Sequence, residues 1–260
     1  MKRIRALFAL LWLGGCVGSA QPDSGHKAHS ADRPAQDLVL HDASRARDVP
    51  VGFIPAVGCE RACPVVVLSS GYGLRHSDYS FISSAASAHG FAVVTVQHEL
   101  PSDPPLATEG DLFVRRAPNW RRGAANLRFV VQRLQRQYPE LDWRRLTLIG
   151  HSNGGDIAAW LLREEPGFAS ALITLDHRRV PLPRGAAVRV LSIRAGDFPA
   201  DPGVLPVPEL ATPQTCIVRV PGAKHDQLYD GGPAELKARI VQWILGFLES
   251  GACPSVTQGA

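Results

Sequence analysis

Residues 146–155 read LTLIGHSNGG, a mostly apolar run that leads into Gly150-x-Ser152-x-Gly154 and one more glycine. The run predicts a buried strand, and the pattern of residues 155–163 predicts a helix directly after it. Glycines on both sides of Ser152 suit a sharp strand-to-helix turn, where side chains would collide with neighbouring backbone. Such a turn presents the serine at a helix N-terminus, whose dipole favours a developing negative charge. We therefore expect Ser152 to be a nucleophile.

Short apolar runs alternate with amphipathic segments on both sides of this turn. Two short strands are predicted between residues 37 and 55. Further buried strands are expected at 65–68, 91–96, 171–175, 188–193 and 216–220, and helices at 79–89, 120–137 and 234–248. This alternation predicts a mostly parallel sheet with helices on both faces, and its functional residues should lie at the carboxyl ends of the strands. The short gap between residues 175 and 188 leaves no room for a large cap domain.

The strand, the Gly-x-Ser-x-Gly turn and the helix resemble the nucleophile elbow of the α/β-hydrolase family, which includes esterases, lipases and dienelactone hydrolases. The resemblance covers the chain from about Asp37 to Leu248 and implies the α/β-hydrolase fold. A serine hydroxyl needs a base within hydrogen-bond reach. The family places this base after the last strand, which implies His225 in the segment PGAKHD, residues 221–226.

The family also supplies an acid that orients the histidine, and it places this acid after the penultimate strand. Asp201 and Asp197 both lie there, in the segment RAGDFPADPGV of residues 194–204. Asp201 begins Asp-Pro-x-Val, which resembles the usual turn after the acid, whereas Asp197 is closer to the expected distance from the strand. We expect Asp201, with Asp197 as the alternative and Asp176 as a more distant one.

Acyl transfer needs N–H donors for the oxyanion, each typically worth about 3 kcal/mol in barrier height. The resemblance implies that one is the N–H of Asn153, the residue after the nucleophile. The loop Ser69-Ser70-Gly71-Tyr72-Gly73 is similar to the family's His-Gly-x-Gly loop and implies Tyr72 as the other donor. Neither a metal nor a cofactor is required.

These residues together predict a serine hydrolase that cleaves a carboxylic ester, or a related acyl bond, through a Ser-His-Asp triad and an acyl-enzyme. The substrate would be a small-molecule ester or a lipid or polymer ester. An acyltransferase or a serine peptidase would use the same triad. A non-catalytic binding protein of the cell envelope is the alternative from another class.

The N-terminus predicts export. Residues 1–20 combine a short basic segment, an apolar run and small residues, as in a secretory signal peptide. Residues 13–16, LGGC, resemble a bacterial lipobox, which implies that Cys16 is lipid-modified; cleavage after Ala20 is the alternative. Residues 21–36 would be a flexible tether, residues 37–250 the hydrolase domain and residues 251–260 a C-terminal tail. We expect a periplasmic or cell-envelope protein that meets the membrane only through an N-terminal lipid anchor.

Four cysteines remain besides Cys16, and an even count in an exported chain favours two disulfides. From their positions relative to the predicted elements we expect Cys59–Cys63 and Cys216–Cys253 among three connectivities. Metal binding is a weak alternative, because no Cys-x-x-Cys spacing is present.

The charge argues against a nucleic-acid partner. The chain has 28 basic and 24 acidic residues, and the signal peptide holds three of the basic and none of the acidic ones. The mature chain would therefore be nearly neutral, and no basic stretch is interleaved with aromatic residues.

Overall fold

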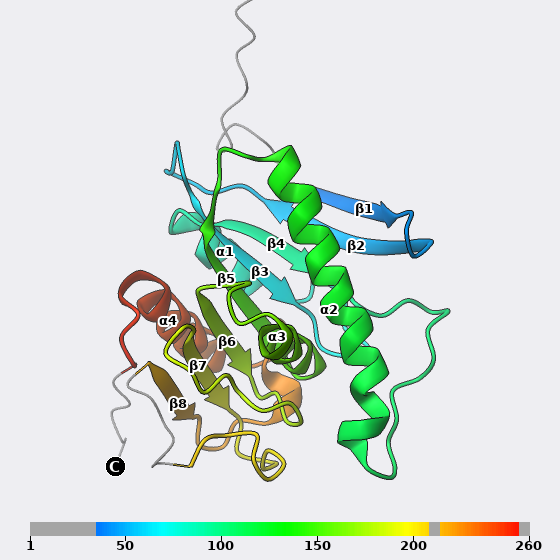
Figure 1. Cartoon of the computed structure of the whole chain (residues 1–260). Coiled ribbons are helices and arrows are strands. Elements are labelled where there is room, and N and C mark those ends of the chain that lie inside the picture. The colour runs from blue at the N-terminus through cyan, green and yellow to red at the C-terminus, as the bar shows by residue number, and fades with distance from the viewer. Residues whose placement is uncertain (1–34, 208–213, 255–260) are drawn as a thin grey trace, which may run out of the picture.

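The structure is a computed structural model that describes residues 35–207 and 214–254 (Figure 1). The predicted signal peptide, Cys16 and nearly all of the tether lie outside these residues. Gln36, expected as the last tether residue, is already the first residue of strand β1.

An eight-stranded sheet forms the centre of the molecule, in the order β1-β2-β4-β3-β5-β6-β7-β8. The strands are β1 Gln36–Asp42, β2 Arg47–Ile54, β3 Pro64–Ser69, β4 Ala92–Val96, β5 Asp142–His151, β6 Ala171–Leu175, β7 Arg189–Arg194 and β8 Thr215–Arg219. Strands β1 and β2 pair antiparallel and β2 pairs antiparallel with β4, whereas all pairs from β4 to β8 are parallel. The carboxyl ends of the six parallel strands therefore meet at one edge.

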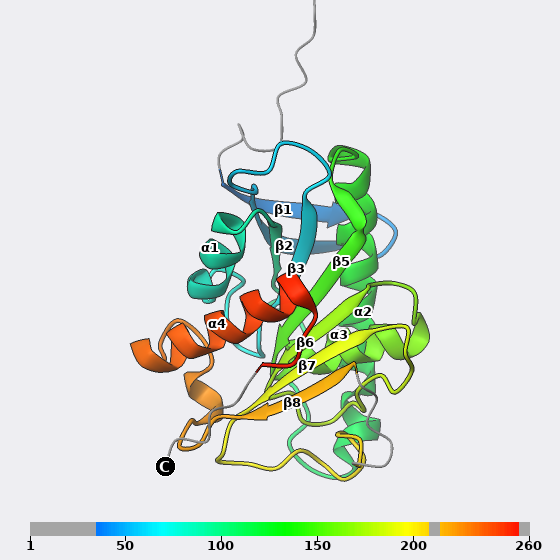
Figure 2. The same ribbon diagram turned by 90° about the vertical axis from the view of Figure 1, so that its left-hand side faces the viewer.

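Helices cover both faces of the sheet, as Figure 2 shows with the sheet seen between them. Helices α2, Leu112–Gln137, and α3, Asn153–Glu164, pack on one face together with alternate side chains of the strands. Helices α1, Ser80–Ala88, and α4, Ala234–Ser250, pack on the other face. The central strands β3, β4 and β6 are buried at every position, because both of their faces are covered. The fold class expected from the sequence is confirmed.

Helix α2 is longer than its apolar pattern predicts. It begins at Leu112 instead of residue 120, because Asp111 caps it by accepting hydrogen bonds from the N–H groups of Phe113 and Val114. Pro118 lies inside the helix, one position before Asn119. The connection 176–188 between β6 and β7 contains no helix, in agreement with the expected absence of a cap domain at that point.

Two disulfides link segments next to strands of the sheet. Cys59–Cys63 closes the loop before β3, and Cys216–Cys253 joins edge strand β8 to the segment after α4. Both pairs are those expected from the sequence. Across the described ranges, no helix has the length and apolar character needed to cross a membrane.

Candidate active site

Ser152 lies at the sharp turn between β5 and α3, at the carboxyl edge of the sheet. Its backbone has φ 52° and ψ −122°, a conformation that L-residues rarely adopt. The turn depends on glycine: a Cβ at Gly150 would lie 2.4 Å from the carbonyl oxygen of Gly154, and one at Gly154 would lie 2.5 Å from that of Ser69. The chain can form this turn because Gly150 and Gly154 carry no side chains that would obstruct the packing of β5, α3 and the end of β3.

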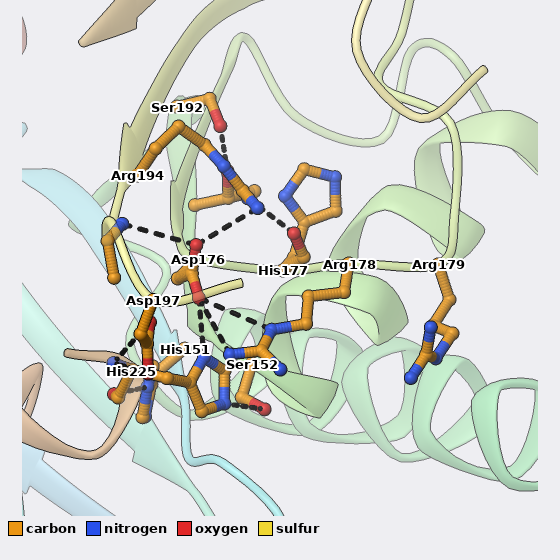
Figure 3. A network of polar contacts seen from close by, with 12 residues as sticks. His151, Ser152, Asp176, His177, Arg178, Arg179, Ser192, Arg194, Asp197 and His225 are labelled. Carbon is orange, nitrogen blue, oxygen red and sulfur yellow. Dashed lines mark hydrogen bonds and ion pairs between the residues drawn. The ribbon is translucent and has the colours of Figure 1, made fainter. Parts of the chain in front are cut away.

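His225 reaches Ser152 from the far end of the sheet. It begins the short 3₁₀ helix His225–Gln227 after β8, and its Nε2 lies 2.8 Å from Oγ of Ser152. On its other side, Nδ1 lies 2.6 Å from Oδ2 of Asp176. An ionised carboxylate can only accept, so Nδ1 carries the proton and Nε2 is free to accept the serine proton. Figure 3 shows the three side chains joined in this order.

Asp176, and not Asp201, is the carboxylate in contact with His225. It is the first residue after β6, the strand that pairs with β5. The N–H of Ser152 donates to the carbonyl of Leu175 at 2.8 Å, which brings Asp176 to the side of Ser152. The side chain of Asp176 is fully buried, whereas that of His225 is partly exposed. The buried acid and the accessible imidazole are suited to orientation and proton transfer, respectively.

Two arginines keep the Asp176 carboxylate charged. Arg194 lies 2.9 Å from Oδ1, which also accepts from the N–H of Ala195, and Arg178 donates to Oδ2 at 3.1 Å. Burial alone would raise the pKa of Asp176, but the hydrogen bond from His225 and the charges of the arginines outweigh it and lower the pKa to about 2. The carboxylate is therefore an anion at neutral pH.

The two aspartates expected as the acid have other contacts. Asp201 pairs with Arg179 at 2.5 Å, and its N–H donates to the carbonyl of Arg178. Asp197 accepts from the backbone N–H of His225, with both carboxylate oxygens at 3.0 Å. The expectation that Asp201 faces the ring of His225 is thus wrong, because Asp176 occupies that place, and the alternative Asp197 contacts the main chain of His225 and not its ring. The pattern after the penultimate strand was misleading, because β6 and not β7 adjoins β5, the strand that leads to Ser152.

The two predicted oxyanion donors have backbone N–H groups without an acceptor among residues 35–207 and 214–254. Asn153 is the first residue of α3, where a helix leaves N–H groups unpaired, and Tyr72 follows the end of β3. The side chain of Asn153 is locked in place: it accepts from Trp120 Nε1 at 3.0 Å and donates to Glu99 and Asn119, each at 2.9 Å. The donor at Asn153 is therefore held by buried contacts.

His151 is a buried neighbour of the site that sequence reasoning did not single out. Its ring lies 5.0 Å from that of His225, centroid to centroid, and it is bonded to Tyr79 and to the main chain of His225. Burial lowers the pKa of His151 to about 3, so this ring is neutral. The only sequence feature that pointed to His151 was its position inside the Gly-x-Ser-x-Gly segment, because its hydrogen-bond partners are more than 70 residues away.

Within the part of the chain that the structure describes, no group of three or more His, Cys, Asp or Glu side chains could hold a metal ion. Hydrogen bonds and ion pairs instead join Ser152 through His225 to Asp176, and Asp176 to two arginines, Arg178 and Arg194 (Figure 3).

No family model matches the sequence, and no curated protein matches it either. A ferulic acid esterase from Streptomyces cinnamoneus has a similar structure, with a TM-score of 0.63 and 21% identity over 90% of this chain and 95% of that chain. A Klebsiella pneumoniae protein assigned as a dienelactone hydrolase has a TM-score of 0.59 and 15% identity over 83% and 98%. Together with the strand order and the nucleophile turn, these likenesses show that the chain has the α/β-hydrolase fold.

Proposed function

We propose that this protein is a serine hydrolase that cleaves a carboxylic ester through an acyl-enzyme. The observation that carries the proposal is the unbroken chain of contacts from Ser152 Oγ through His225 to Asp176, at 2.8 and 2.6 Å. A serine hydroxyl becomes a useful nucleophile only when a base of this kind accepts its proton. The strained backbone of Ser152 further supports the proposal, because strain of this kind is concentrated at functional sites.

In the first half of the reaction, Nε2 of His225 takes the proton of Ser152 as Oγ attacks the ester carbonyl carbon. The tetrahedral oxyanion would be bound by the N–H groups of Asn153 and Tyr72. When the intermediate collapses, the imidazolium donates its proton to the departing alkoxide, and the acyl group stays on Ser152. In the second half, His225 deprotonates a water molecule that attacks the acyl-enzyme, and the proton returns to Ser152 as the acid leaves.

Asp176 would act by stabilising the imidazolium that exists in both halves. Its carboxylate is already ionised at neutral pH, since its pKa is about 2, so it can balance the charge on His225 without changing its own protonation. It also holds the proton on Nδ1, which leaves Nε2 aimed at Ser152. Asp197 would help by accepting a hydrogen bond from the backbone N–H of His225.

The names of the structural neighbours agree with ester chemistry. One is a ferulic acid esterase and the other is assigned as a dienelactone hydrolase. Two large apolar side chains, Tyr72 and Phe198, are exposed in the loops that follow β3 and β7 at the active-site edge. An aromatic ester therefore belongs in the substrate panel beside aliphatic ones.

The test is hydrolysis of p-nitrophenyl esters from acetate to decanoate, and of an aromatic methyl ester, by the purified protein. Ser152→Ala should abolish turnover, whereas Ser77→Ala, which changes an exposed serine before α1, should not alter it. A fluorophosphonate should label the wild type and not Ser152→Ala. Equal activity of wild type and Ser152→Ala would refute the proposal.

The other uses of the same site give different products. An acyltransferase would form a new ester when an alcohol is added, and a serine peptidase would cleave amides as well as esters. Absence of both turnover and labelling would favour a binding protein of the cell envelope. We favour ester hydrolysis because it demands less of the leaving group than amide cleavage.

We also propose that the protein is exported and carries a lipid on Cys16. The two disulfides support export, because such bonds persist in oxidising compartments. Expression with radiolabelled palmitate should label the wild type and not Cys16→Ser. Equal labelling of the two, or membrane association that survives the substitution, would contradict the anchor.

A further inference from the structure

Three hydrogen bonds in series connect the loop after β3 with the loop that carries His225. We call this hydrogen-bond chain, through Tyr79 and His151, the relay. The N–H of Gly71 lies 2.8 Å from the hydroxyl oxygen of Tyr79, which in turn lies 2.8 Å from Nδ1 of His151. Nε2 of His151 lies 3.1 Å from the carbonyl oxygen of His225. Gly71 precedes the expected oxyanion donor Tyr72. The chain thus begins next to one element of the proposed machinery and ends on another.

The direction of each hydrogen bond follows from chemistry. The carbonyl of His225 can only accept, so the proton of the neutral His151 ring is on Nε2 and its Nδ1 is an acceptor. Tyr79 must then donate its hydroxyl proton to Nδ1 and accept from the N–H of Gly71. Burial raises the pKa of the Tyr79 phenol, which therefore keeps the proton that it donates. The donor and the acceptor of each of the three hydrogen bonds are therefore defined.

Both side chains are built into the core. Tyr79 is 1% exposed and His151 is 3% exposed, and their rings pack edge to face with centroids 5.8 Å apart. The loop lies directly against them, since a Cβ at Gly71 would be 3.0 Å from Nδ1 of His151 and 3.2 Å from the Tyr79 oxygen. A buried, fully paired network of this kind specifies one arrangement, because any other leaves polar groups unsatisfied.

The two ends of the relay lie beside the groups whose positions are important for the proposed reaction, the N–H of Tyr72 and the ring of His225. The carbonyl of Gly71 accepts from the N–H of Leu74, so both of its backbone polar groups are bonded and the following N–H, that of Tyr72, is left with a defined direction. At the other end, His225 is held on its N–H by Asp197 and on its carbonyl by His151. The backbone at His225 is therefore held in one position, from which the imidazole ring reaches Ser152.

We propose that Tyr79 and His151 are positioning residues that fix the oxyanion loop and the His225 loop relative to Ser152. This role rests on the proposed hydrolase function and adds to it two residues that do not touch the substrate. Loss of the chain should leave the triad chemically complete but less well placed. A misplaced donor or base lowers the rate of the chemical step more than it weakens substrate binding.

The central experiment is Tyr79→Phe, which removes a single oxygen atom. We expect kcat for a p-nitrophenyl ester to fall ~10- to 100-fold, a part of the 10²- to 10³-fold effect of deleting an oxyanion donor. KM should change less than about twofold, since binding of the ester ground state is untouched. Tyr138→Phe is the matched control, because Tyr138 is equally buried but lies between α2 and β5, at the opposite edge of the sheet.

Substitutions of His151 separate the effect of its hydrogen bonds from the effect of the volume of its side chain. Glutamine keeps one donor and one acceptor, so His151→Gln should retain most of the activity, whereas His151→Leu should lose about as much kcat as Tyr79→Phe. Because the two residues act in one chain, the Tyr79→Phe/His151→Leu double variant should be no slower than the slower single variant. If the two substitutions caused independent structural defects, the factors by which each lowers kcat would instead multiply in the double variant.

A second readout does not depend on turnover. Long-range ¹H–¹⁵N correlation spectra of the wild type should show His151 as the Nε2-protonated tautomer. Tyr79→Phe should shift the Nδ1 resonance, because this nitrogen loses its hydrogen-bond donor. The relay is overturned if the tautomer is the opposite one, if Tyr79→Phe turns over like the wild type, or if Gln is no better than Leu at residue 151. Inactivity of the wild type would overturn the proposed function, while the spectra would still test the relay.

Discussion

Asp176→Asn is the substitution that most directly tests the proposed triad. Asparagine keeps the size of the side chain but removes the negative charge that faces Nδ1 of His225 at 2.6 Å. It also offers an amide donor toward Nδ1, which would favour the tautomer with the proton on Nε2. The ring would then present a proton to Ser152 instead of an acceptor, so both the charge and the orientation of the base are lost.

The size of the effect follows from the contact distance. With the atoms 2.6 Å apart, the centres of the carboxylate and imidazolium charges are about 4 Å apart, which is worth ~4 kcal/mol at an effective dielectric constant of 20. Each 1.4 kcal/mol of barrier is a factor of ten, so kcat should fall ~10³-fold from the charge alone. The wrong tautomer adds to this, and the corresponding change in a serine protease triad costs about 10⁴-fold.

The assay is steady-state hydrolysis of the best p-nitrophenyl ester, at a temperature where circular dichroism shows the variant to be folded. This check is needed because Arg194, with a side chain only 2% exposed, loses its charged partner, and unpairing a buried ion pair costs roughly 3 kcal/mol or more. Asp201→Asn is the control, since it removes a carboxylate that pairs with Arg179 away from the ring. The reasoning is refuted if Asp176→Asn keeps more than about a tenth of the activity, or if Asp201→Asn loses as much.

Two further predictions concern stability. Burial raises the pKa of Asp156 to about 6, so between pH 4 and 6 the folded chain binds more protons than the unfolded chain, and the free energy of unfolding falls as pH rises. Urea denaturation of the wild type and Asp156→Asn should therefore show a difference that changes by on the order of 3 kcal/mol across this window, and parallel pH profiles would argue against a raised pKa. Removing Cys216–Cys253 by alanine substitution should cost ~4 kcal/mol and removing Cys59–Cys63 ~2 kcal/mol, because the bonds span 37 and 4 residues and longer loops lose more chain entropy. Equal denaturation midpoints for the two variants would contradict this order.

Local pattern was sufficient for the nucleophile turn and most of the fold. An apolar strand, two glycines around Ser152 and a helix are short-range features, and steric exclusion at Gly150 and Gly154 leaves few conformations open to them. The alternation of strands and helices likewise determined the parallel sheet and its covered faces. The start of α2 was placed too late, because an exposed capping residue, Asp111, has no hydrophobic period to reveal it.

Contact between residues from different strands could be decided only by the tertiary structure. Ser152 and Asp176 meet because β6 lies beside β5, and His225 reaches them because the loop after β8 folds back over both ends. Three aspartates were candidates for that contact. No local sequence feature shows that Asp176 is buried between two arginines whereas Asp201 is partly exposed beside Arg179. The relay through Tyr79 and His151 depends in the same way on residues more than 70 positions apart.

The sequence by itself therefore determined the nucleophile turn, the fold class and the candidates for base and disulfides, since each follows from local sterics, periodicity or chain order. The tertiary structure decided which acid faces His225 and which buried side chains hold the site together. The physical reason is that hydrogen bonds and ion pairs act over a few ångströms. Their partners are therefore set by the packing of strands and loops, which no local pattern of residues encodes.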